Sequence, residues 1–149
     1  MSEFRIEKRE EPVVIFIADG IVYEGDLFLS PFAQHRTGGQ SVSDLLLEDQ
    51  PFLPLKTTGG EFHLVKKSMI SHLRYDVREE SGIELPEREV KITFLGGEEL
   101  QGTVRIDLPA GKNRIQDFFN SSDKYFAMQS GGHDYLVNMN LIHGVVMGS

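Results

Sequence analysis

Residues 13–30 read VVIFIADGIVYEGDLFLS, and residues 90–107 read VKITFLGGEELQGTVRID. The apolar residues that the two stretches share before the glycine-containing turn recur at every second position, 13, 15 and 17 in the first and 90, 92 and 94 in the second, a pattern typical of a β-hairpin. Four positions are identical between them: Val13, Ile15, Gly20 and Gly25 in the first, Val90, Ile92, Gly97 and Gly102 in the second. This self-match indicates two copies of one supersecondary unit.

The match continues beyond the hairpin. Val42, Asp44, Leu45, Leu46, Phe52, Leu53 and Leu55 correspond to Ile115, Asp117, Phe118, Phe119, Tyr125, Phe126 and Met128. Leu64, Val65, Ile70 and Leu73 correspond to Leu136, Val137, Ile142 and Val145. We therefore divide the chain into a charged lead-in (1–12), repeat 1 (13–75), an acidic linker (76–89) and repeat 2 (90–147).

Each repeat is predicted to have the element order β-β-α-β-β-β. Val42, Leu45 and Leu46 lie at i, i+3 and i+4, as expected for one face of a short helix, and repeat 2 has the same spacing. We expect strands at 13–17, 21–30, 51–57, 62–66 and 69–75 in repeat 1, and at 90–94, 98–107, 124–130, 134–138 and 141–147 in repeat 2. The predicted fold class is mainly β with short helices, in small curled sheets or partly open barrels like those of Sm and SH3 domains.

Face parity predicts the first turn. Ile15 and Tyr23 can share a face only if the loop between their strands has an odd number of residues, because side chains alternate along a strand. A loop of Ala18, Asp19 and Gly20 satisfies this condition, with the glycine in the left-handed conformation. The inward positions are then 13, 15, 17, 23, 27 and 29 in repeat 1, and 90, 92, 94, 100, 104 and 106 in repeat 2.

Four glycines are predicted to have structural roles. Gly97 should occupy the same turn position in repeat 2 as Gly20 does in repeat 1. Gly25 and Gly102 fall in the middle of a predicted strand, where glycine usually marks a bulge or a sharp bend.

Composition limits the class of protein. The chain has 149 residues, no cysteine and a net charge of −8, so disulfides and zinc–thiolate sites are excluded. No apolar run is long enough to span a membrane, and the first twelve residues do not resemble a signal peptide. We expect a soluble, cytoplasmic protein. Segment 76–89 alone carries −4; both repeats are nearly neutral, which argues against a nucleic-acid surface.

The outer face of the first hairpin differs between the repeats. Repeat 1 has Val14, Phe16 and Phe28 where repeat 2 has Lys91, Thr93 and Arg105. An apolar outer face requires cover. We therefore predict that these three residues of repeat 1 form a protein interface.

Polar residues show no established catalytic or metal-binding pattern. The five histidines, His35, His63, His72, His133 and His143, have no recognised metal-ligand spacing. Asp44 and Asp117 are shared by the repeats and are predicted to stabilise the start of each helix; Ser41 and Asp44 have the spacing of a capping box. We predict no catalytic residue, metal or cofactor.

The repeated hairpin V-x-I-x-x-x-x-G-x-x-x-x-G-x-[LV]-x-[LI] resembles the first signature of Sm-like small β-barrels. The segment 141–146, LIHGVV, is similar to their second signature, whereas 69–75 lacks its glycine. The predicted helix lies between the second and third strands, whereas Sm-like proteins carry their helix at the N-terminus. The whole repeat also resembles an uncharacterised bacterial β-rich domain. An Sm-like relationship would imply RNA binding.

Three hypotheses of function follow. The first is a non-enzymatic binding or assembly module that contacts a protein partner or a second copy of itself. The second is an Sm-like RNA-binding protein with a basic stripe formed by Lys66, Lys67 and Arg74. The third is a small-ligand-binding protein or enzyme with a site between the repeats, near His133 and Asp134.

Overall fold

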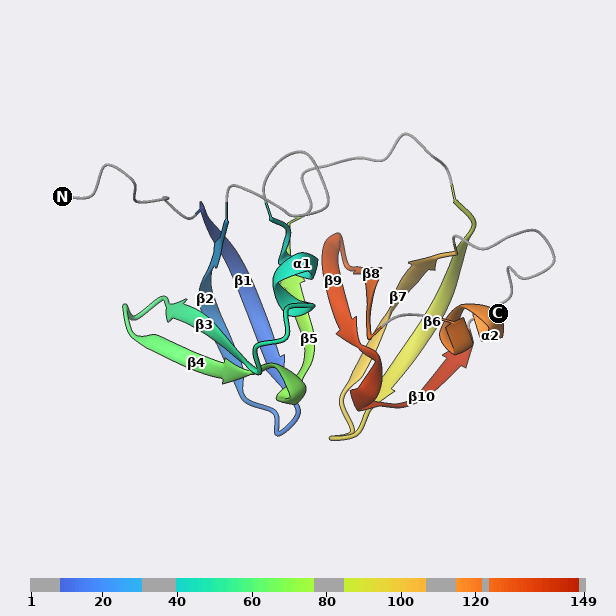
Figure 1. Cartoon of the computed structure of the whole chain (residues 1–149). Helices are drawn as coiled ribbons and strands as arrows, with labels where there is room; N and C mark the ends of the chain where they lie inside the picture. Colours follow the sequence, from blue (N-terminus) through green and yellow to red (C-terminus); the bar gives the residue numbers. More distant parts are fainter. Residues whose placement is uncertain (1–8, 31–39, 77–84, 107–114, 122–123, 148–149) are drawn as a thin grey trace.

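The computed structural model describes residues 9–30, 40–76, 85–106, 115–121 and 124–147 (Figure 1). Within these residues, ten antiparallel strands form one open sheet, accompanied by two short α-helices. The strands are β1 (Arg9–Ile17), β2 (Val22–Leu29), β3 (Phe52–Thr57), β4 (Phe62–Lys66), β5 (Ile70–Tyr75), β6 (Glu87–Phe94), β7 (Glu99–Arg105), β8 (Tyr125–Ser130), β9 (His133–Asn138) and β10 (Ile142–Met147). The prediction of a mainly β protein is confirmed.

The helices lie where the apolar spacing predicts them. They are α1 (Val42–Leu46) and α2 (Ile115–Ser121), and one 3₁₀ turn precedes each of β5 and β10 (Lys67–Met69 and Met139–Leu141). Ser41 and Asp44 form the predicted capping box: the Ser41 hydroxyl accepts from the Asp44 amide, and the Asp44 carboxylate accepts from the Ser41 amide.

Two strands begin earlier than predicted. β1 starts at Arg9, inside the predicted lead-in, because it pairs with β2 as far as Leu29. β6 starts at Glu87, inside the predicted linker, where it pairs with Arg105 of β7. In both cases the second strand of the hairpin is long enough to pair with residues that precede the predicted start of the first strand.

The order of strands across the sheet is β10-β6-β7-β8-β9-β5-β1-β2-β3-β4. β9 and β5 lie side by side in the middle of the molecule, and β4 and β10 lie at its two ends (Figure 1). Chain neighbours are therefore not always sheet neighbours: β5 pairs with β1 on one edge and β9 on the other.

The β1–β2 hairpin has the predicted register. Ile15 pairs with Tyr23, and Phe16 pairs with Val22. Gly20 has a φ of 95° and Gly97 a φ of 90°, so both turns need the left-handed conformation that glycine adopts without a steric penalty. The inward positions at 13, 15, 17, 27 and 29 are buried, as are 90, 92, 94, 100, 104 and 106; Tyr23 is partly buried against the same core.

Gly25 and Gly102 permit a close approach between strands. The β1–β2 register runs through Gly25 without a shift, so there is no bulge in that pairing. A Cβ at Gly25 would overlap the backbone carbonyl of Lys56 on β3, and one at Gly102 would overlap that of Gln129 on β8. Both glycines are needed because the backbone of the neighbouring strand, β3 or β8, lies too close to leave room for a side chain.

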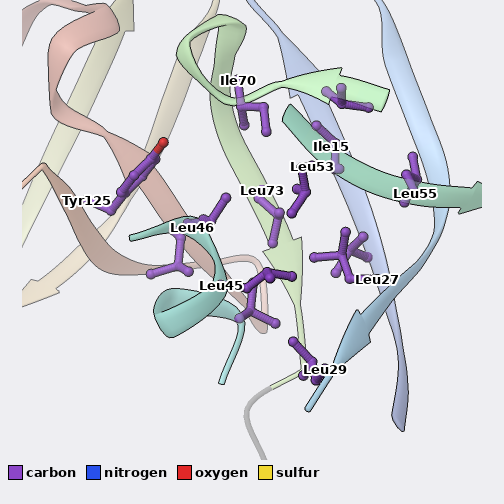
Figure 2. Packing of buried hydrophobic residues seen from close by; sticks show 14 of the residues in the cluster. Ile15, Leu27, Leu29, Leu45, Leu46, Leu53, Leu55, Ile70, Leu73 and Tyr125 are labelled. Atoms are coloured by element: carbon purple, nitrogen blue, oxygen red, sulfur yellow. The ribbon is translucent and has the colours of Figure 1, made fainter. Parts of the chain in front are cut away.

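The apolar residues form two core clusters. The first draws on β1–β5 and α1, and Figure 2 shows how Leu27, Leu46, Leu53 and Leu73 converge in it. The second cluster is built from β6–β9 and is partly covered by α2. Tyr125 of β8 and Leu136 of β9 belong to the first cluster although they come from the second half of the chain.

Replacing Gly25 or Gly102 by alanine should lower the free energy of unfolding by about 1–3 kcal/mol, because the new methyl group overlaps backbone that cannot rotate away. Urea unfolding followed by circular dichroism measures this change. Gly59→Ala is the matched control, because among the described residues its Cβ would meet nothing closer than the Thr57 hydroxyl at 3.9 Å. Equal stability of all three variants would contradict the close-approach explanation.

Candidate functional site

The three residues predicted to form an interface are not gathered in one patch. Phe16 lies near the turn of the β1–β2 hairpin, opposite Val22, whereas Phe28 lies at its other end, opposite Glu10. The Phe28 ring stacks on Phe62 of β4, with ring centres 6.0 Å apart. Val14 lines an open groove beside β5. All three side chains are partly buried.

Phe16 packs against the second core cluster. Its ring stacks on His72 of β5 with ring centres 4.2 Å apart, and His72 stacks in turn on Phe94 of β6 at 4.7 Å. Tyr135 of β9 closes the group, 5.9 Å from the His72 ring. Phe16 is thus part of an aromatic stack that links the two halves of the chain.

His72 is the most perturbed titratable group of the stack. It is 5% exposed, and burial lowers its pKa from the ordinary 6.5 to about 4. Its Nδ1 lies 2.9 Å from the hydroxyl of Ser71, which also lies 3.0 Å from the Phe16 carbonyl oxygen. The ring is therefore neutral at physiological pH, and it packs between the rings of Phe16 and Phe94.

The pairing of β5 with β9 is the joint between the two halves of the sheet. His72 pairs with Val137, Leu73 with Leu136, and Tyr75 with Asp134. At one end of the joint, the Asn138 side-chain amide donates to the Ile70 carbonyl at 2.9 Å. This joint therefore combines backbone pairing, apolar side chains and one buried side-chain hydrogen bond.

Tyr125 adds a second contact across the joint. Its ring lies in the first core cluster, next to Leu46 of α1 in Figure 2. Its buried hydroxyl has no hydrogen-bond partner among the described residues, and burial raises its pKa. The contact is consequently made by the apolar ring rather than by the hydroxyl.

Large apolar side chains are exposed at both ends of the sheet. On β3 and β4 these are Phe52 (46% exposed), Phe62 (71%) and Leu64 (69%). On β10 they are Val146 (55%) and Met147 (62%). Exposed apolar side chains along an unpaired strand edge favour association with another chain.

An open groove of about 290 Å³ lies beside the joint. It is lined by Pro12, Val13, Val14, Glu24, Gly25, Asp26, Thr58, Arg74, Tyr75, Asp76 and His133. Burial, together with the charges of Asp134 and Glu11, raises the pKa of Tyr75. Of the two residues expected near a site between the repeats, His133 lines this groove. Asp134 pairs with Tyr75, and its carboxylate accepts from the Gln129 side-chain amide at 3.2 Å.

The three basic residues considered as a stripe have different environments. Lys66 is exposed and Arg74 is partly exposed. Lys67 is 4% exposed, and its amine donates to the Leu45 and Glu48 carbonyls at 2.9 and 3.0 Å. Burial lowers the pKa of this amine. Lys67 therefore holds the end of α1 and is not directed at a ligand.

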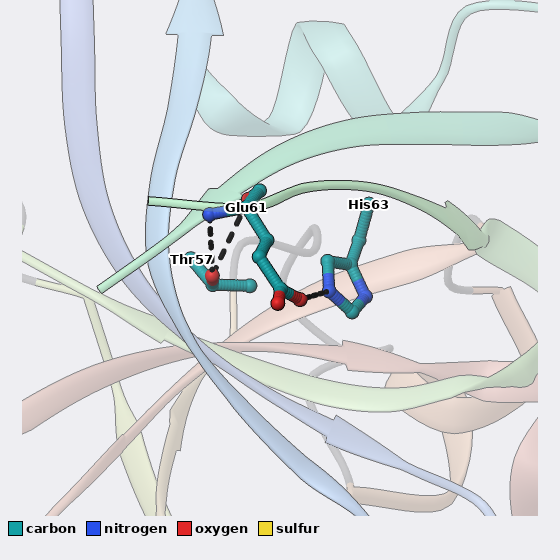
Figure 3. Close-up of polar contacts among 3 residues, drawn as sticks. All are labelled: Thr57, Glu61 and His63. Carbon is teal, nitrogen blue, oxygen red and sulfur yellow. Dashed lines mark hydrogen bonds and ion pairs between the residues drawn. The ribbon is translucent and has the colours of Figure 1, made fainter. Parts of the chain in front are cut away.

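The other histidines occupy separate places. His63 of β4 lies 3.1 Å from the Glu61 carboxylate, beside the hydrogen bonds between Thr57 and Glu61 that hold the β3–β4 turn (Figure 3). His143 is exposed on β10. His35 lies outside the described residues. No group of three potential metal ligands occurs in the part of the chain that the structure describes.

The two shared aspartates lie in the first turns of the helices. Asp44 completes the capping box of α1, and Asp117 lies in the first turn of α2. At this position a carboxylate interacts favourably with the unpaired amides of the helix start.

No protein family, curated protein or solved structure matches the chain. In the described residues, no helix has the length and apolar character needed to cross a membrane.

The exposed residues at the sheet ends were missed by the sequence reasoning. Phe62 and Leu64 lie on the outward positions of β4, and the alternation along the strand indicates this. Alternation does not reveal whether an outward residue is covered by a neighbouring strand. That depends on the order of strands in the sheet.

The stability of the protein should fall as the pH decreases from 6.5 to 4, because the unfolded state then binds a proton at His72 that the folded state excludes. At about 1.4 kcal/mol per pKa unit, this contribution reaches about 3 kcal/mol at pH 4. His72→Phe should lack it. Urea unfolding at pH 7, 5.5 and 4.5 compares the two proteins, with His133→Phe as the control at an exposed histidine. A parallel loss of stability in His72→Phe and wild type would contradict this assignment.

Lys67→Met should lower the free energy of unfolding by about 1–3 kcal/mol, because it keeps the apolar stem but leaves two carbonyls without their donor. Lys66→Met, at the exposed neighbouring position, should change it by less than about 0.5 kcal/mol. Thermal unfolding of both variants measures the difference. If the two substitutions have the same effect, the Lys67 amine does not support α1.

Proposed function

We propose that this protein is a non-enzymatic assembly module that uses the apolar ends of its sheet to bind other protein chains. The observation that carries the proposal is the exposure of Phe62 and Leu64 on β4, at one end of the sheet, and of Val146 and Met147 on β10, at the other. The described strands provide no cover for either edge. The proposed partner is a protein, either another chain or a second copy of this one.

We further infer that the chain is a tandem repeat of one small β-rich unit. The first five strands lie in the order β5-β1-β2-β3-β4, and the last five lie in the order β10-β6-β7-β8-β9. Replacing each strand by its counterpart five places later converts the first order into the second. Equivalent residues also pair: Ile15 with Leu73 and Ile92 with Val145.

Irregularities in the pairing support the same inference. The β1–β5 register shifts between Phe16 and Ile17, and the β6–β10 register shifts between Ile142 and Gly144, at the matching point of the sheet. A shift is a local feature with no reason to recur unless both halves share one design. The matching register shifts, together with the corresponding glycines at 25 and 102, support two copies of one unit.

Each unit is proposed to be a small curled sheet, comparable to a partly open barrel. The first core cluster collects residues from all five strands of its half, as expected when a sheet bends around its own inner face. At Gly25 and Gly102 the neighbouring strand lies against the glycine, and we propose that this close approach accompanies a bend of the second strand.

The wild-type protein is expected to have a mass in solution of at least twice the 16.8 kDa of the chain. Phe62→Lys with Leu64→Lys should weaken association by more than tenfold, because burying each side chain contributes about 1.5–3 kcal/mol. Light scattering on a sizing column measures the mass, and circular dichroism checks that the variant is folded.

Ile21→Lys is the matched control, since Ile21 is a 49% exposed apolar residue in the β1–β2 turn. It should leave the mass of the assembly unchanged. A wild-type protein that remains a monomer throughout the concentration range would contradict self-association.

A further inference from the structure

We propose that the partner is a second copy of this chain, and that the β3–β4 end of one copy docks on the β10–α2 end of the next. This inference rests on the proposed assembly function and specifies its surface, its orientation and its register. The template is the joint inside the chain, where β8 and β9 dock on β5 and α1.

Inside the chain, the first core is completed by the second half. Tyr125 and Leu136 enter the first core cluster from β8 and β9. With them in place, Leu45 and Leu46 of α1 and Ile70 of β5 are all buried, with exposures of 9%, 1% and 1%. The first unit thus depends on apolar side chains that another unit provides.

The second unit has the same surface without such cover in the described chain. The residues that correspond to Leu45, Leu46, Ile70 and Leu73 are all only partly buried: Phe118, Phe119, Ile142 and Val145. The rings of Phe118 and Phe119 pack edge-on against Phe126, within their own half. In the first half, Tyr125 packs in the same cluster as the corresponding residues of α1, Leu45 and Leu46.

The side chains that would complete the second core are exposed at the other end of the same chain. Phe52 corresponds to Tyr125, and Leu64 corresponds to Leu136. Their equivalence in the fold is clear from pairing, because Phe52 lies opposite Lys66 just as Tyr125 lies opposite Asn138. A phenylalanine can replace Tyr125 in this role, since the Tyr125 hydroxyl makes no hydrogen bond to the described residues.

The backbone predicts a unique register for the joint between chains. In the template, Leu73 pairs with Leu136 and Tyr75 with Asp134. Transferred to the ends of the sheet, Val145 lies opposite Leu64, and Met147 lies opposite Phe62. The four exposed or part-exposed apolar side chains at the two edges thereby become cross-strand neighbours.

Charge and hydrogen bonding are compatible with this joint. Strands β4 and β10 contain no acidic residue, and their one lysine is Lys66. Lys66 corresponds to Asn138, whose side chain donates to the Ile70 carbonyl. The Lys66 amine is accordingly placed to donate to the Ile142 carbonyl of the next copy.

The two docking surfaces differ, so the contact is heterologous. A chain that docks through its β3–β4 end still has its β10–α2 end free, and the reverse also holds. Further chains can therefore add until a ring closes, or without limit as a filament. The mass measured by light scattering distinguishes these products.

The test uses cysteine cross-linking, which is specific because the chain has no cysteine of its own. Phe62→Cys and Met147→Cys are prepared as separate variants, mixed, and oxidised under mild conditions. The two cysteines lie directly opposite each other in the proposed joint, within the about 4.4–6.8 Å between Cα atoms that a disulfide requires. We expect a covalent dimer that contains one chain of each variant, identified by mass spectrometry after proteolysis without reduction.

Lys66→Cys mixed with Met147→Cys is the out-of-register control. Residue 66 lies four positions along β4 from residue 62, about 13 Å away, which is too far for a disulfide. Tyr75→Cys with Asp134→Cys in one chain is the positive control, because this pair is already opposed in the joint. It should form a link within a single chain.

The outcomes separate the inference from the proposed function. A link at 62–147 that exceeds the 66–147 link at least tenfold supports the proposed register. Equal yields of cross-linked dimer from the two mixtures would overturn the inference but leave the assembly function in place. The same holds if the cysteine variants assemble like the wild type and no cross-link forms. A wild-type protein that remains monomeric by light scattering would overturn the inference and self-association, and would leave a different protein chain as the proposed partner of the sheet ends.

Discussion

The structure depends on the pairing of β5 with β9, because this pairing joins two five-stranded halves into one sheet. Backbone hydrogen bonds alone would align the strands with little net stabilisation. The accompanying side chains add apolar packing to the joint: Tyr125 and Leu136 belong to the first cluster, and Phe16 packs against the second. Each half therefore contributes to the interior of the other.

The same joint explains why residues at matching positions of the two sequence stretches have different surroundings. His72 on β5 is stacked between Phe16 and Phe94, whereas a Cβ at the matching position on β10, Gly144, would meet no atom of the described residues within 4 Å. Leu136 on β9 is buried, and its counterpart Leu64 on β4 is exposed. The position of a strand in the sheet, central or terminal, decides the environment of each side chain.

Phe16 illustrates how the sequence can indicate a covered face without identifying its cover. Its outward position on an apolar strand predicts that something packs against it, and the structure places His72 and Tyr135 there. Phe28, on the same face, instead contacts the exposed Phe62. The apolar pattern was informative, but the neighbours come from strands distant in the chain, so a hairpin considered alone could not name them.

The sequence by itself determined the local structure: the strands, the two helices, the capping box at Ser41 and the glycine turns. Periodicity, capping and left-handed turns act over a few residues, and each leaves a direct mark on residue order. Only the tertiary structure decided that β5 pairs with β9 and that β4 and β10 are the ends of the sheet. It also decided that the Lys67 amine is turned inward and that Gly25 is needed where the backbone of β3 lies close to β2. These features depend on which distant segments meet, because strand edges are chemically alike and pairing partners are selected by the packing of the whole sheet.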